Sequence, residues 1–172
     1  MAGIKRFQVK NMQTTSSVPP MRRQDRALSS ADALAIFERA EVAAISVITE
    51  QGPYGFPISP VLLGTTLYFH SALSGRKVDA FARDPRVWVS AWTDVHAAAD
   101  KFTTYFESAM ASGAVRAVTA PEERRRALAA LCRKFTPDNM ADFENALRRS
   151  DARTAVWAIA LENITGKAKR HH

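Results

Sequence analysis

The sequence predicts a mainly β fold of the α+β class, an antiparallel barrel of about six strands with peripheral helices. Three observations support this prediction. Short segments rich in β-branched and aromatic residues recur along the chain and are separated by turn residues. Segments in which apolar residues recur with helical spacing are inserted between them. A length of 172 residues is that of one domain with a substantial core.

The first twenty residues differ from the rest of the chain. Residues 1–20 contain TTSSVPP and show no sustained hydrophobic period, so we expect a flexible N-terminal arm. One domain is expected to follow over residues 21–170. Its first element is a helix for which Ser29 or Ser30 supplies the N-cap. One face of this helix is apolar: Ala33, Ile36, Phe37 and Ala40.

Three strands are predicted next. Residues 42–49 are rich in β-branched side chains, and the turn EQGPYG follows them. Residues 56–63 form the second strand, in which Pro57 and Pro60 remove ladder donors. This pair favours an edge strand or a bulge over a central strand. A short turn then leads to the third strand at residues 66–71.

A helix after Gly75 is predicted to end at Asp84-Pro85, and residues 86–93 form the next strand. This strand has two faces that both accept burial. One face carries Val87, Val89 and Ala91, and the other carries Trp88, Ser90 and Trp92. In a small barrel the second face needs a partner outside the barrel, which a homodimer or a cofactor at its interface would supply.

The C-terminal half completes the sheet. We expect a loop at residues 95–101 and a long strand at residues 105–118, with a bulge or bend at Gly113. Residues 154–162 form the last strand.

Two helices are predicted between these last strands. A capping box at Thr119–Glu122, with Pro121 at the first helical position, begins a helix that runs to about Phe135. A second helix begins at Thr136-Pro137 and runs to about Arg149.

The composition is that of a soluble globular protein, with 47% hydrophobic and 24% charged residues. No apolar run approaches membrane-spanning length, and the N-terminus lacks an apolar signal region. We therefore expect a cytoplasmic protein without a membrane partner. The lone Cys132 excludes an intrachain disulfide and a cysteine-rich zinc site, and we expect it to be a buried apolar filler.

The net charge of +7 is concentrated at the two ends of the chain. Residues 1–26 carry a net charge of +5 and residues 167–170 carry +3, so the remainder carries −1. Basic ends on a near-neutral body most often aid solubility, although a polyanion contact stays open as an alternative. Nucleic-acid binding is therefore not favoured.

Residues 67–92, LYFHSALSGRKVDAFARDPRVWVSAW, form the most informative segment. A strand breaks at Ser74-Gly75 and restarts as a helix with Arg76 and Lys77 in its first turn. This is the wrong end for cations, since the helix dipole favours negative charge there. Two cations, free backbone N–H groups and the hydroxyls of Ser71 and Ser74 converge on a site suited to a phosphate. The alternative is that the two basic residues are solvated surface charges.

Four further segments accompany this one in order: MRRQDRALSSADALAIFERAEVAAISV, GFPISPVLLGTTLYFHSA, YFESAMASGAVRAV and RTAVWAIALENITGKAKR. Together they resemble the pyridoxamine 5'-phosphate oxidase-like split-barrel superfamily, and most closely its nitroimidazole-resistance (Nim-type) flavoproteins. The resemblance covers about residues 21–170. It implies a split antiparallel barrel, bound FMN, and a homodimer with each site at the subunit interface.

The cofactor that the resemblance implies also fits the residues. Ser71, Arg76, Lys77 and the Gly75 turn provide the cations and N–H donors that the FMN phosphate needs.

The resemblance further implies which residues line the flavin ring. Pro57, Ile58 and Ser59 would lie along it, as would Tyr105 and Ser108.

Two polar residues have more than one interpretation. His70, at the end of a core strand, is either a packed, hydrogen-bonded side chain or, as the resemblance implies, a catalytic residue beside the flavin that stabilises the reduced ring or passes a proton. Glu107 either forms a cross-strand ion pair or pairs with Arg76, Lys77 or Arg116. No metal site is expected, because His70 and His96 lack further ligands at suitable spacing.

These observations favour an FMN-dependent oxidoreductase. A reduced nicotinamide, NADH or NADPH, would supply a hydride, and a nitro compound or quinone would accept electrons. True pyridoxamine 5'-phosphate oxidase activity is not favoured, because the chain ends ITGKAKRHH without that enzyme's substrate-phosphate motif. The alternative is a non-catalytic flavin- or haem-binding protein that acts as a sensor, store or carrier.

Overall fold

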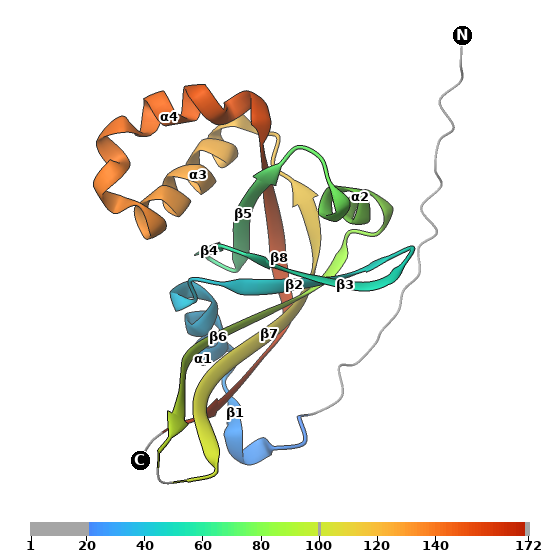
Figure 1. Ribbon diagram of the computed structural model, residues 1–172, viewed down its shortest axis with the longest axis vertical. Helices are drawn as coiled ribbons and strands as arrows, with labels where there is room; N and C mark the ends of the chain where they lie inside the picture. The colour runs from blue at the N-terminus through green and yellow to red at the C-terminus, as the bar shows by residue number, and fades with distance from the viewer. Residues whose placement is uncertain (1–20, 100, 171–172) are drawn as a thin grey trace.

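The computed structural model describes residues 21–99 and 101–170, in which one antiparallel sheet dominates (Figure 1). The strands are β1 (Ala27–Leu28), β2 (Ala43–Thr49), β3 (Gly52–Ile58), β4 (Val61–Leu63), β5 (Thr66–Ala72), β6 (Arg86–Ala98), β7 (Thr103–Ala117) and β8 (Thr154–Lys169). The helices are α1 (Ser30–Arg39), α2 (Arg76–Arg83), α3 (Pro121–Phe135) and α4 (Phe143–Ser150), with 3-10 turns at Gln24–Arg26, Pro137–Asp142 and Asp151–Arg153. The predicted N-terminal arm lies outside the described residues.

The strand order is β3-β2-β6-β7-β8-β5-β4, with β1 paired to β8. The sheet curls around a common core, and β3 and β4 at its two ends are not paired with each other in the described chain. The fold is therefore the predicted split barrel, open rather than closed. It has eight strands instead of about six, because β1 adds a strand and the predicted strand at residues 56–63 is divided into β3 and β4.

The predicted helix α1 is confirmed together with its cap. The Ser29 hydroxyl accepts a hydrogen bond from the Asp32 backbone N–H at 3.1 Å. Ala33, Ile36 and Phe37 are fully buried and join side chains from the inner face of the sheet in the main core. The apolar face of this helix therefore contributes directly to the core of the barrel.

The prolines act as the sequence predicted. β3 is an edge strand, where the missing N–H of Pro57 costs no ladder bond. Pro60 is fully buried and lies in the gap between β3 and β4. The chain changes direction there instead of continuing as one strand.

The predicted loop at residues 95–101 is wrong. β6 continues to Ala98, past an irregularity between Thr93 and His96 where Asp94 adopts a φ of 53°. The side chains of Val95 and His96 are exposed, so the sequence shows no alternation of apolar and polar residues here that would predict a strand. Backbone pairing with β7 is what makes it a strand.

Gly113 marks a close approach of two strands. A Cβ atom at this position would lie 2.5 Å from the carbonyl oxygen of Ala160 and 2.7 Å from Ile159 Cγ2. The pairing of β7 with β8 shifts register between Met110 and Ser112, next to this glycine. β7 is thus irregular as predicted, but the irregularity lies between Met110 and Ser112, whereas Gly113 is regularly paired and leaves room for the close approach of β8.

The segment between β7 and β8 packs on a second, smaller core, which consists of Val61, Tyr68, Val118, Ala127, Leu131, Val156 and Ala158.

The predicted bounds of α3 are confirmed, and Pro121 occupies its first turn. The N-cap is Ala120 and no side chain caps the helix, so the predicted capping box is wrong. The second predicted helix begins as a 3-10 turn before α4. Cys132 is half-buried rather than buried.

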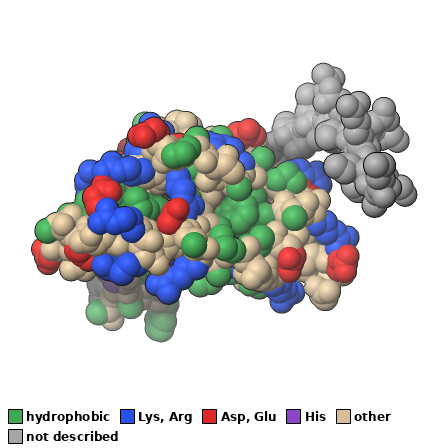
Figure 2. All heavy atoms as spheres, turned by 90° about the horizontal axis from the view of Figure 1, so that it is seen from above, with side chains coloured by type: hydrophobic (Ala, Val, Ile, Leu, Met, Phe, Trp, Pro, Cys, Tyr) green, Lys and Arg blue, Asp and Glu red, His purple; other side chains and the backbone are tan. Residues whose placement is uncertain are grey.

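Lysine and arginine side chains over α3 and α4 are interspersed with acidic ones (Figure 2). Arg124 pairs with Asp151, Arg125 with Glu144, and Arg149 with Asp142. Three arginines of this face are therefore paired with surface carboxylates, which balances part of its positive charge.

Candidate functional site

A pocket of about 290 Å³ brings five of the nine predicted site residues together. It lies where the end of β3, β5 and the first turn of α2 meet. Its lining residues are Val42, Pro57, Ile58, Ser59, His70 and Lys77. We call it the His70 pocket. Val42 is the member that the sequence did not predict, since it directly precedes β2 and carries no polar group that marks a site.

His70 is exposed on β5, although its neighbours Tyr68 and Phe69 are buried at 4% and 0% exposure. The described residues include no hydrogen-bond partner for its imidazole. The interpretation of His70 as a packed, hydrogen-bonded core residue is therefore wrong. The rigid strand presents the ring at the mouth of the pocket, where a ligand can contact it.

The N-terminus of α2 borders the same pocket. Gly75 is its N-cap with a φ of +121°, which L side chains rarely adopt. A Cβ atom there would meet nothing within 4 Å, so the glycine is required by the backbone conformation and not by space. No side-chain hydrogen bond caps this helix, in contrast to α1. Its first N–H groups lack intrahelical acceptors and suit an anion.

Arg76 and Lys77 diverge from this turn. The Arg76 guanidinium carbon lies 4.1 Å from the centroid of the Tyr54 ring, and Lys77 Nζ lies 4.8 Å from that of Phe56. Lys77 lines the His70 pocket, whereas Arg76 lines a neighbouring hollow beside Glu50. Neither ring was predicted to contact the basic turn. The signal was present in the alternation of aromatic residues along β3, which lies against the basic turn.

Ser71 is engaged within the fold. Its Oγ accepts a hydrogen bond from Trp157 Nε1 at 2.9 Å and donates to the Ala72 carbonyl oxygen at 2.7 Å. The Trp157 ring packs against Phe81 of α2 with centroids 5.0 Å apart. Ser71 therefore links β5 and β8 and does not line the His70 pocket with Lys77.

Tyr105 and Ser108 lie on opposite faces of β7. Tyr105 is buried and lines a separate cavity beside Lys169, whereas Ser108 points to the outer face and is paired with Trp92. Neither residue lines the His70 pocket of its own chain.

The outer face of β2, β6 and β7 is apolar and exposed. Ile48, Trp88, Trp92 and Met110 have exposed fractions between 37% and 61%. We call these four residues the outer apolar face. The pairing register runs from Pro57 through Ala44 and Ser90 to Met110, so Pro57 at the pocket lies in the same row as this face.

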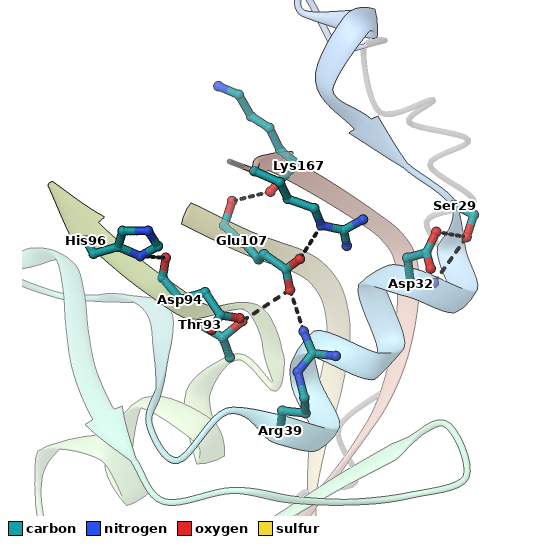
Figure 3. A network of polar contacts seen from close by, with 10 residues as sticks. Ser29, Asp32, Arg39, Thr93, Asp94, His96, Glu107 and Lys167 are labelled. Carbon is teal, nitrogen blue, oxygen red and sulfur yellow. Dashed lines mark hydrogen bonds and ion pairs between the residues drawn. The ribbon is translucent and has the colours of Figure 1, made fainter. Parts of the chain in front are cut away.

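The buried carboxylate of Glu107 forms a separate polar network (Figure 3). It pairs with Arg39 at the end of α1 and with Arg170 Nε at 2.5 Å. The predicted partners Arg76, Lys77 and Arg116 are wrong, since Arg116 pairs with Glu123. Glu107 therefore forms a structural ion pair, as one interpretation predicted. The pair is not simply cross-strand, because Glu107 of β7 binds Arg39 of α1 and Arg170, the residue after β8.

The described residues contain no helix that is both long and apolar enough to cross a membrane. They also bring together no group of three or more histidine, cysteine or acidic side chains that could hold a metal ion.

The chain is similar to a known protein family. The family model for pyridoxamine 5'-phosphate oxidase matches residues 29–168. A search of curated proteins finds no match.

Three solved structures share the fold. A protein described as a 5-nitroimidazole antibiotic resistance protein from Bacteroides thetaiotaomicron VPI-5482 superposes with a TM-score of 0.66 at 23% identity, covering 83% of this chain and 86% of that one. The FAD- and haem-binding protein from Mycobacterium smegmatis gives 0.71 at 22% identity, covering 85% and 74%. An FAD-binding protein from the same organism gives 0.57 at 17%, covering 84% and 99%. Because the family model spans most of the chain, the protein belongs to the pyridoxamine 5'-phosphate oxidase family.

Proposed function

We propose that this protein is an FMN-dependent oxidoreductase that acts as a homodimer. The observation that carries the proposal is the His70 pocket, in which an exposed imidazole, the Pro57–Ser59 segment and Lys77 meet beside the uncapped N-terminus of α2. Membership in a family named for a flavin-dependent activity and the two FAD-binding structural relatives support it.

The residues present fit a flavin phosphate and ring. Lys77 and the N–H groups of the first turn of α2 suit the phosphate. Arg76 belongs to the same turn and adds a second positive charge nearby. Pro57 and Ile58 offer an apolar wall for the ring, with polar contact from Ser59. We propose FMN over FAD because this arrangement offers one phosphate cradle.

A second copy of the chain would complete the site. A volume of about 290 Å³ is at the lower end for a ligand pocket, and its lining residue Pro57 is in register with residues of the outer apolar face. A second copy on that face would bring its own Ser108 toward the flavin, whereas Tyr105 is buried on the opposite face of β7 and would not reach it. The second copy would also exclude water from the ring.

FMN, when bound, supplies reversible hydride and single-electron chemistry. The chain's own residues then have defined tasks: Lys77 orients the phosphate, and the His70 imidazole holds or passes a proton at the substrate. We propose NADH or NADPH as the donor and a small nitro compound or quinone as the acceptor. A cytoplasmic location remains a prediction.

The second candidate is a flavin- or haem-binding protein without turnover. One relative is described as binding both FAD and haem, which favours this alternative specifically. The visible spectrum of untreated protein separates the cofactors. Stopped-flow mixing with NADH or NADPH then separates an enzyme from a passive binder.

For the oxidoreductase we expect a flavin spectrum that bleaches on mixing and recovers when a nitro compound or quinone is added. A haem spectrum would reject the proposed cofactor. A flavin spectrum that neither nicotinamide changes would favour the passive binder.

A further inference from the structure

A second cavity, of about 450 Å³, lies at the opposite end of the sheet from α2. Its lining residues come from the segment before α1, from the start of β7 and the chain just before it, and from the end of β8, elements that lie near one another in Figure 1. Its charged and aromatic lining residues are Arg23, Asp25, Arg26, Lys101, Tyr105, Lys169 and Arg170. We call it the basic cavity. It shares no lining residue with the His70 pocket.

The charge of this lining is strongly unbalanced. Among the described residues that line it, five side chains are cationic and Asp25 is the one carboxylate. Asp25 is bound by Arg23, whose Nε donates to its Oδ1 at 2.7 Å. Arg26 Nε lies 3.9 Å from the same carboxylate, beyond hydrogen-bonding distance. Asp25 therefore offsets the charge of Arg23, and Glu107 offsets that of Arg170, so Arg26, Lys101 and Lys169 supply the excess positive charge of the described lining.

Two of the lining cations, Lys169 and Arg170, are held in place by the fold. Lys169 donates to Thr103 Oγ1, and its Nζ lies 5.8 Å from the centroid of the buried Tyr105 ring. Arg170 is anchored through its Nε to Glu107, which is itself bound by Arg39. A concave group of positive charges that is ordered before binding favours an anion, because little side-chain entropy is lost when it binds.

We propose that the basic cavity binds a small phosphorylated molecule with at least two phosphate groups. Arginine forks match phosphate oxygens, and the net positive charge of the lining suits more than one anionic group. The volume exceeds that of a single phosphate. An extended nucleic acid is the alternative occupant, and its binding is one outcome of the test. This inference does not depend on flavin binding.

The test is a calorimetric titration of inorganic pyrophosphate into the full-length, flavin-saturated protein. We expect one binding site, and we expect Arg26→Gln or Lys169→Gln to weaken it about tenfold or more, as the loss of one charge-assisted contact implies. The two variants alter different elements, so failure of one to fold leaves the other informative. Arg133→Gln, at an exposed position on α3, removes the same charge elsewhere and should leave binding unchanged.

Two results would overturn the proposal. One is the absence of pyrophosphate binding, whether or not a single-stranded oligonucleotide binds tightly through Arg26 and Lys169 instead. The other is a loss of pyrophosphate affinity in Arg133→Gln that equals the loss in Arg26→Gln or Lys169→Gln. Failure of the flavin assignment is seen separately in the visible spectrum, and the pyrophosphate titration can then be performed on the flavin-free protein.

Discussion

At the scale of single residues, His70 stands out because a buried strand carries an exposed imidazole. Phe69 on one side is fully buried and fixes the backbone, so the position of the ring is set by the fold and not by its own contacts. An exposed imidazole on a buried strand is available for proton transfer, and its titration breaks no contact within the fold.

The first prediction is that His70→Ala keeps the melting temperature and flavin content but slows oxidation of the reduced enzyme by about a hundredfold or more, the loss typical of a general acid. Single-turnover oxidation, melting temperature and flavin content should be measured on one preparation. His96→Ala, which removes an exposed histidine on β6, is the control and should change none of the three. An unchanged oxidation rate in His70→Ala would end the catalytic assignment.

Glu123 provides the second residue-scale prediction. Hydrogen bonds from Arg116 and then Tyr68 hold the pKa of Glu123 at about 2, below its ordinary value of 4.5. The unfolded chain therefore binds more protons than the folded one between these values, so the stability that Glu123 contributes is present above pH 4.5 and is lost as the pH falls through about 2.

We expect Glu123→Gln to lower the free energy of unfolding at neutral pH by about 1–3 kcal/mol, since it removes a charge-assisted contact. The difference from the original protein should shrink steadily from pH 4.5 toward pH 2, as measured by urea unfolding. Glu122→Gln changes an exposed neighbour on α3 and should show little effect. A difference that does not vary with pH would contradict the assigned pKa.

At the scale of elements, we propose that the first turn of α2 recognises the flavin phosphate. Its first turn combines the positive φ of Gly75, an uncapped N-terminus and Lys77, which faces the pocket. Lys77→Gln should therefore weaken FMN binding about tenfold while leaving riboflavin, which lacks the phosphate, nearly unchanged.

Fluorescence titration with both flavins checks this prediction. Arg83→Gln, at the other end of the same helix, is the matched control and should retain the affinity of the original protein for FMN. Equal losses for FMN and riboflavin in Lys77→Gln would show that the lysine supports the pocket and does not recognise the phosphate.

A neighbouring element fixes the walls of the pocket. Lys134 of α3 donates from Nζ to the carbonyl oxygens of Glu38, Ala40 and Pro60 at 2.9, 2.7 and 3.0 Å. Burial lowers the pKa of this lysine, and nearby Glu41 and Glu38 act in the opposite direction. These bonds join the chain just before Val42 to the chain just after Ser59, two residues that line the pocket.

At the scale of the whole molecule, we expect the outer apolar face to be covered by a partner. Monomeric proteins rarely leave large apolar patches exposed, and two tryptophans are typical interface anchors. Trp92→Glu should therefore weaken both the dimer and flavin binding, since the proposed site depends on the same face.

Sedimentation over a range of concentrations, combined with flavin content, measures this prediction. Phe102→Glu, at an exposed aromatic near the hairpin tip, is the control and should leave the dimer intact. A stable monomer of 19.0 kDa that still holds flavin in the original protein would contradict the shared site.

Much of the fold follows from local patterns in the sequence. The apolar spacing of α1 and the β-branched run of β2 predicted those elements closely, because their side chains are buried on one face. The extension of β6 to Ala98 could not be predicted, since only backbone pairing with β7 maintains it.

The candidate site was predictable in part for a similar reason. The glycine turn and Lys77 are adjacent in sequence, and the resemblance to known flavoproteins located Pro57 and His70. The opposite directions of Arg76 and Lys77 depend on Tyr54 and Phe56, which contact them only after β3 has folded against α2. The hydrogen bond between Ser71 and Trp157 likewise joins residues distant in the sequence.

The prolines of β3 also bear on how copies of this protein avoid uncontrolled association. An open sheet presents a free edge that can template the addition of another chain's strand. Alternate residues of a strand direct their N–H groups to the same side, so Pro53 and Pro57 remove two donors from one side of β3 together. At the other end, β4 has three residues and offers little length for such pairing. The barrel can therefore remain open without acting as a seed for aggregation.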